Sequence, residues 1–251
     1  MSAMLTIAKR EFRSYFDSPL AYVVICLSFF ALGLMYFMLN GGFWQADRSS
    51  IERLFEYAPM GLSFLVVPVV TMRLIAEERR SGTLEMLITL PVKDSDVVLG
   101  KYLGALGLVM VLVVATLVYP IGMFKVPWNL GPLDTGPVLS GYIGLILFSA
   151  AAVSIGLLVS SFAESQAVAF FITFFVLAAL WFFDNAAQSL SASGGGFATF
   201  LAAVLQYVSF QTRLGGFWRG LIDSRDVIFF LSVTVLALFV AFRALERRKW
   251  A

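Results

Sequence analysis

A charged segment, residues 77–92, lies between two long apolar runs and is the part of the chain best suited to recognise another molecule. Its acidic start extends the preceding run, Ser81 and Gly82 interrupt the helix, and Thr83 can cap a second short helix that ends at Pro91. That helix would have an apolar face with acidic flanks, which fits a groove on a soluble partner. The residues with this candidate role are Glu77, Glu78, Gly82, Thr83, Leu84, Glu85, Leu87, Ile88 and Pro91. The alternative is a connector that only reverses the chain direction.

The residue types argue against catalysis by this chain. There is no histidine, which removes the commonest general base and metal ligand. The single cysteine, Cys26, lies in an apolar run and cannot form a disulfide within the chain. The sequence has no G-x-x-x-x-G-K-[ST] phosphate loop, and the glycine cluster Gly194–Gly196 is not followed by a lysine. We therefore expect no catalytic residue, no metal site and no cofactor bound by the chain itself.

The composition predicts a membrane protein. Of the 251 residues, 60% are hydrophobic and 14% are charged, against about 25% charged in a soluble domain. Six apolar runs are long enough to cross a hydrocarbon core of about 30 Å. These predicted spans are residues 19–39, 55–75, 99–124, 138–162, 166–183 and 227–243. The expected fold is an all-α membrane protein, one transmembrane domain over residues 1–251 with six transmembrane helices.

The distribution of basic residues predicts the orientation. If both termini are cytoplasmic, twelve of the eighteen Lys and Arg residues lie on the inner side. This excess satisfies the positive-inside rule. Within the spans ionisable residues are nearly absent, and Glu56, Lys101 and Glu164 sit at boundaries, where Lys101 could snorkel to the interface. That scarcity argues against an ion-coupled transporter.

A basic amphipathic helix is predicted ahead of the first span, over residues 1–18. Its apolar stripe is Leu5, Ala8, Phe12, Tyr15 and Phe16. Such a helix would lie in the headgroup layer as an elbow, with its basic face toward anionic lipid. The elbow residues expected at the membrane interface are Lys9, Arg10, Phe12, Arg13 and Phe16. A solvated leader is the alternative.

The predicted outer region between the last two spans is long, and its apolar part, Phe197–Val208, is too short to cross the membrane. We expect a short re-entrant or interfacial helix there. Charged and aromatic residues near the outer mouth could pair with one another, anchor at headgroups or meet a substrate. These candidates are Arg213, Trp218, Arg219, Asp223, Arg225 and Asp226. In the fourth span, small residues such as Gly141, Gly144 and Gly156 favour close helix packing.

The order of these features resembles the permease subunits of type-2 (ABC-2) ATP-binding-cassette exporters. The resemblance rests on the basic elbow helix, on six spans with both ends inside, and on the motif Glu77-Glu78-x-x-x-Gly82-Thr83-x-Glu85-x-Leu87 followed by Pro91. It covers essentially the whole chain. The stretch Arg219–Val227 is similar to the gliding-motility permease (GldF-like) branch of that superfamily.

The resemblance implies a set of partners. Two permease subunits, identical or related, would form the transport pathway in the inner membrane of a bacterium, and cytoplasmic ABC ATPase subunits would bind ATP and Mg²⁺ below them. Residues 77–92 would contain the coupling helix that docks on the ATPase. The lipid bilayer is a further partner and nucleic acid is not.

Two other functions are compatible with the sequence. A membrane anchor or scaffold of a motility or envelope machine would use the same ATPase contacts without moving a solute. An intramembrane enzyme is poorly supported, because no buried catalytic pair is visible in the spans.

Overall fold

The computed structural model describes residues 3–38, 52–82, 93–124, 135–192 and 195–247. These segments are helical, with no strand among them. The helices are α1 (Ala3–Asp17), α2 (Pro19–Met38), α3 (Glu52–Gly61), the π-helical turn η3 (Leu62–Val66), α4 (Val67–Thr71), α5 (Ala76–Arg80), α7 (Asp94–Ala115), α8 (Val118–Phe124), α9 (Thr135–Phe162), α10 (Gln166–Ala192), α11 (Gly196–Val208), α12 (Phe210–Trp218) and α13 (Ser224–Arg247).

The helices confirm a multi-pass membrane protein. Five helical stretches are long and apolar enough to span a bilayer: Glu52–Arg80, Asp94–Gly122, Thr135–Phe162, Gln166–Ala192 and Ser224–Glu246. A sixth is obtained if α1 and α2 are counted together, although they are bent by 74°. In the described residues each of the six predicted apolar runs therefore falls mainly on helix, and the number of candidate spans is five or six.

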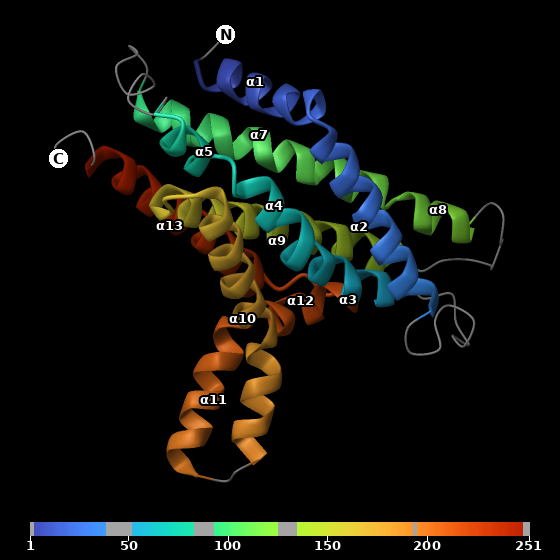
Figure 1. Ribbon diagram of the computed structural model, residues 1–251. Helices are drawn as coiled ribbons and strands as arrows, with labels where there is room; N and C mark the ends of the chain where they lie inside the picture. Colours follow the sequence, from blue (N-terminus) through green and yellow to red (C-terminus); the bar gives the residue numbers. More distant parts are fainter. Residues whose placement is uncertain (1–2, 39–51, 83–92, 125–134, 193–194, 248–251) are drawn as a thin grey trace.

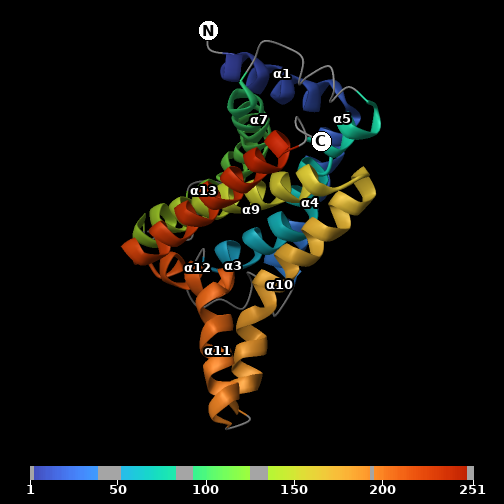
Figure 2. The ribbon, with the colours of Figure 1, turned by 90° about the vertical axis from the view of Figure 1, so that its left-hand side faces the viewer.

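Helix α9 forms the centre of the bundle and packs against α3, α4, α7, α10, α12 and α13. Figures 1 and 2 show it running between these helices. The glycines predicted to allow close packing do so: a Cβ atom on Gly141 would lie 2.5 Å from the Phe55 ring, and one on Gly144 2.8 Å from Phe217. By contrast, only 22% of the most apolar stretch of α10, and likewise of α13, is buried inside the protein, against 67% for α9. Helices α10 and α13 therefore present most of their surface outward.

One end of the bundle collects the helices that flank the predicted coupling segment. In Figure 1, α1, α5, the beginning of α7 and the end of α13 lie together at the upper left. The start of α3 and helix α8 lie at the opposite end. The first and last helices thus meet at the same end of the bundle.

Helix α10, which corresponds to the fifth predicted span, is longer than predicted. The expected span 166–183 continues to Ala192, and α11 packs back against it to form a hairpin that projects from the bundle (Figures 1 and 2). Helix α10 continues past Asp184. The side chain of Gln188, one turn later, donates a hydrogen bond of 2.8 Å to the Asp184 carboxylate, so these polar side chains are accommodated within the helix. Helix α12 was not expected from the sequence; Ser209 caps it by accepting from the Thr212 amide.

The second predicted span is interrupted near one end. Sequence analysis expected residues 77–80 to extend this span directly, but the helix stops at Thr71, passes through the turn Met72–Ile75 and resumes as α5. The π-helical turn η3 and Pro68 precede the break, and both are common causes of helix irregularity. Helix α5 is therefore a separate short element whose direction must be set by its neighbours.

Candidate functional site

The break before α5 leaves backbone groups without their helical partners, and side chains from two other helices satisfy them. The Leu74 amide bonds to the carbonyl of Thr71 instead of that of Val70. The Val70 carbonyl accepts a hydrogen bond of 2.9 Å from the phenol of Tyr15 on α1. Buried backbone groups need such partners, because an unsatisfied one costs about 1–3 kcal/mol.

On the other side of the break, the backbone amides that lack a helical acceptor form hydrogen bonds with α9. The hydroxyl oxygen of Ser160, which is fully buried, accepts from both the Ile75 and the Ala76 amide, each at 3.1 Å. The guanidinium of Arg79 then donates to the carbonyls of Phe162 and Ala163, each at 3.1 Å, at the end of α9. A cation at a helix C-terminus is favourable because it meets the negative end of the helix dipole. Helix α5 is thus fastened to the end of α9.

A buried lysine fastens the other side of α5. Lys101 of α7 is 3% exposed and lies 2.7 Å from a carboxylate oxygen of Glu78 on α5 and 2.8 Å from one of Glu11 on α1. Sequence analysis expected that Lys101 could snorkel to the interface; its side chain is instead buried in the protein, where two carboxylates hold it. Removing one member of such a buried pair typically costs about 3–5 kcal/mol. The ion cluster therefore joins three separate helices.

Helix α1 packs closely along α7. A Cβ atom on Gly100 would lie 2.8 Å from Ile7, and one on Gly104 would lie 2.6 Å from Glu11, so only glycine permits this approach. The packed face is rotated from the predicted stripe, since Leu5 is 48% exposed. The amphipathic pattern indicated an apolar side but did not distinguish a protein neighbour from lipid. The basic elbow residues Lys9, Arg10 and Arg13 are exposed, on the side away from α7.

The aromatic elbow residues are partly buried. Phe12 and Phe16 contact each other with ring centroids 5.1 Å apart, and Phe16 also packs on the core. Burial raises the pKa of the Tyr15 phenol far above its ordinary value, the nearby Glu11 adds to the shift, and Arg73 opposes it. Tyr15 therefore stays protonated and keeps the proton that it donates to Val70.

The described part of the coupling segment ends at Gly82. Glu77 forms an exposed pair with Arg73 at 3.2 Å. Gly82 has a φ of +72°, the left-handed conformation that glycine favours after a helix, and it ends α5 where the sequence predicted an interruption. The other candidate residues lie outside the described residues; they are Thr83, Leu84, Glu85, Leu87, Ile88 and Pro91.

The outer-mouth candidates do not converge on one site. Arg213 and Asp226 do come together, in a salt bridge of 2.9 Å, and the Arg213 guanidinium also lies 4.2 Å from the centroid of the Tyr207 ring. This cluster ties α12 to α13 and to the end of α11. Trp218 packs against the core, whereas the side chains of three further candidates are exposed: Arg219, Asp223 and Arg225. Asp223 accepts from the Arg225 amide at 2.9 Å at the start of α13.

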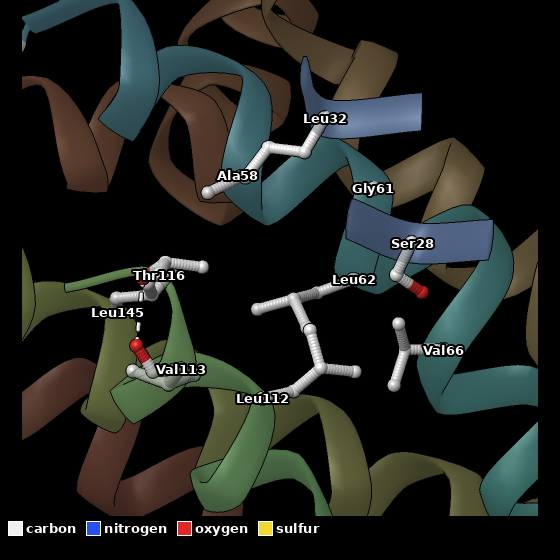
Figure 3. Close-up of a pocket in the computed structure, with 10 residues that line it drawn as sticks. All are labelled: Ser28, Leu32, Ala58, Gly61, Leu62, Val66, Leu112, Val113, Thr116 and Leu145. Atoms are coloured by element: carbon white, nitrogen blue, oxygen red, sulfur yellow. Dashed lines mark hydrogen bonds between the residues drawn. The ribbon is translucent and has the colours of Figure 1, made fainter. Parts of the chain in front are cut away.

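A small cavity lies inside the bundle, between α2, α3, η3, α7 and α9 (Figure 3). It has room for about one or two water molecules. Two of its lining hydroxyls already donate within their own helices, Ser28 to Val24 and Thr116 to Val113, each at 2.6 Å. Its other lining residues are apolar or glycine, so it offers little to a polar solute. They are Leu32, Ala58, Gly61, Leu62, Val66, Leu112, Val113 and Leu145.

Sequence reasoning missed the residues that position α5. Ser160 lies in the predicted fourth span but was not singled out, and the small residues of that span indicated packing only. Glu11 and Lys101 are 90 positions apart, so no local spacing linked them. Among the described residues, no group of three or more Cys, Asp or Glu side chains could hold a metal ion.

The fold and this junction define a class of protein: a helical, multi-pass membrane protein in which α1, α5 and the start of α7 meet at one end of the bundle. Residues 5–250 match the family described as ABC-2 family transporter protein. The chain therefore belongs to the ABC-2 family and is a membrane permease of the ABC transporter type, a class without its own ATPase site. No curated protein matches it at a significant level.

Proposed function

We propose that this chain is the permease subunit of an ATP-driven exporter in the inner membrane of a bacterium, with both termini in the cytoplasm. Family membership supports a role in an ABC transporter. The observation that carries the coupling assignment is the junction at α5. A short helix held by Ser160, Arg79 and Lys101 is a rigid base for the segment that follows it.

Under this proposal, residues 77–92 dock on a separate cytoplasmic ATPase. The segment has an acidic side through Glu77, Glu78 and Glu85, and an apolar side through Leu84, Leu87 and Ile88. The complementary surface is an apolar groove with basic residues beside it. ATP and Mg²⁺ bind to the ATPase, and force reaches α5 through the docked segment.

A second permease subunit, identical or related, completes the transport pathway. Helices α10 and α13 are the least buried spans and therefore have surface available for a partner or for lipid. The basic face of α1, with Lys9, Arg10 and Arg13, meets anionic headgroups. The outer-mouth residues with exposed side chains, Arg219 and Arg225, anchor the opposite end at the other membrane surface.

The proposed physiological role is that of the gliding-motility (GldF-like) branch, which is gliding motility or export to the cell envelope. This assignment is supported by the stretch Arg219–Val227, which covers the connection after α12 and the start of α13. The alternative is a membrane anchor or scaffold that binds the ATPase and moves no solute.

The test is purification of the tagged chain together with a candidate ABC ATPase encoded nearby. We expect the ATPase to co-purify and the complex, but not the chain alone, to hydrolyse ATP. Failure of every such ATPase to bind, or nucleotide turnover by the pure chain, would overturn the proposal. Solute movement into vesicles containing the complex separates transport from the scaffold function.

A further inference from the structure

We propose that α1 acts as a splint across the break in the second span, and that Lys101 is the positioning residue through which α1 sets the direction of α5. This inference rests on the proposed function for its purpose, since α5 leads into the segment assigned to the ATPase. It concerns, however, only contacts within this chain.

The argument begins with the position of the break. Residues Met72–Ile75 separate α4 from α5, so no continuous helix carries force between them. Helix α1 contacts the chain directly before this break and is linked to it after the break through Lys101 of α7. Before it, Tyr15 donates to the carbonyl of Val70 at 2.9 Å. After it, Glu11 holds Lys101, which in turn holds Glu78 of α5.

The two attachments lie one turn apart on α1, because Glu11 and Tyr15 are four residues apart and share one face of the helix. Both belong to the face that packs on α7, where Gly104 allows the backbone of α1 to approach. A helix held at two successive turns is stiff over that length. It therefore spans the break as a rigid piece, whereas the turn itself has few backbone hydrogen bonds.

The exposed basic face of α1 offers a surface through which lipid could move this helix. Lys9, Arg10 and Arg13 are on the side opposite to Glu11 and Tyr15. Movement or reorientation of α1 at the membrane surface would change the α5 direction through Lys101. Conversely, a pull on α5 would reach α1 by the same route.

The test is hydrogen exchange of the backbone amides in the purified full chain, reconstituted in nanodiscs without any ATPase. Glu11→Ala removes the side-chain oxygens that reach Lys101 and thereby the attachment of α1, but leaves the Lys101–Glu78 pair in place. We expect exchange at residues 75–80 to accelerate by about tenfold or more, with α9 and α13 unchanged. Lys101→Met should produce the same local change. The matched control is Arg243→Met, which removes an exposed ion pair within α13 and should leave exchange at residues 75–80 within about twofold of the wild type.

Two outcomes would overturn the inference. One is unchanged exchange at residues 75–80 in Glu11→Ala, which would mean that α5 is held without α1. The other is an equal increase in every helix, which would assign Glu11 and Lys101 to general stability. Because no ATPase is present, the result stands whether or not the proposed docking is correct.

Discussion

The phenol of Tyr15 donates a hydrogen bond of 2.9 Å to the carbonyl of Val70, 55 positions later in the chain. The bond exists because the break after α4 frees this carbonyl, and it connects the first helix to the end of the second span. A helix expected to contact mainly lipid thus completes the backbone hydrogen bonding of another helix.

This bond predicts a specific pH dependence. Burial raises the pKa of Tyr15 in the folded state, so its contribution to stability is complete below the unfolded value of about 10 and is lost as the pH rises above it. Tyr15→Phe should lower the melting temperature in detergent by about 2–4 °C, corresponding to about 1 kcal/mol. The difference from the wild type should be constant from about pH 6 to 9 and shrink above about pH 10. A difference that already changes near neutral pH would contradict the burial of this phenol.

Ser160 provides a second prediction. Ser160→Ala removes the acceptor for two buried amides, each of which then costs about 1–3 kcal/mol if it stays unsatisfied. Thermal stability should fall, and exchange of the Ile75 and Ala76 amides should increase. Ser149→Ala is the matched control, because Ser149 is equally buried on α9 but its hydroxyl donates to the Leu145 carbonyl within the same helix. Similar behaviour of the two variants would contradict the role assigned to Ser160.

The packing of α1 on α7 gives a third prediction. In Gly104→Ala the new methyl group would lie 2.6 Å from Glu11, so α1 must move outward. Proteolysis within α1 should become faster in the reconstituted protein. Gly215→Ala is the control on α12, where a Cβ atom meets nothing within 4 Å and helix propensity improves by about 1 kcal/mol. Unchanged protease sensitivity in Gly104→Ala would show that α1 is not held against α7.

Most of the architecture could be predicted from the sequence because its determinants are local. Runs of apolar residues predict spans in any bilayer protein, and the small residues of the fourth span correctly indicated close helix packing there. The interruption at Ser81 and Gly82 was also visible, because the glycine needs no neighbour to adopt a left-handed conformation.

The candidate site around α5 could be predicted only in part, because its positioning contacts are long-range. The break at Met72–Ile75 is stable because Ser160, 85 positions away from Ile75, accepts the freed amides. No acidic residue lies three or four positions from Lys101 in its helix, so the sequence suggested that its charge would reach the membrane interface by snorkelling. The hairpin of α10 and α11 was missed in the same way, since the polar residues after Phe183 satisfy one another within the helix.

The membrane orientation is a fourth prediction. In a chain with Cys26 replaced by alanine, single cysteines placed at Asp47 or Ser193 should react with an impermeant reagent added outside intact cells. A cysteine at Lys93 should react only after the membrane is opened. The expectation follows from the positive-inside rule. The reverse labelling pattern would place the α5 end of the bundle outside and remove the ATPase docking assignment.

The central claim is that the segment after α5 docks on an ATPase. Leu87 lies on the predicted apolar face, so Leu87→Asp places an unpaired charge in the groove of the partner and should weaken docking about a hundredfold. The control is Leu221→Asp, the same substitution at a side chain that is 66% exposed, in the connection between α12 and α13. Both variants should insert and reach equal levels in the membrane.

The deciding measurement is the amount of ATPase that co-purifies with each chain at matched membrane levels. We predict wild-type recovery with Leu221→Asp and almost none with Leu87→Asp. Equal recovery with all three chains would contradict the account, because residues 77–92 would then be an ordinary connection between two spans.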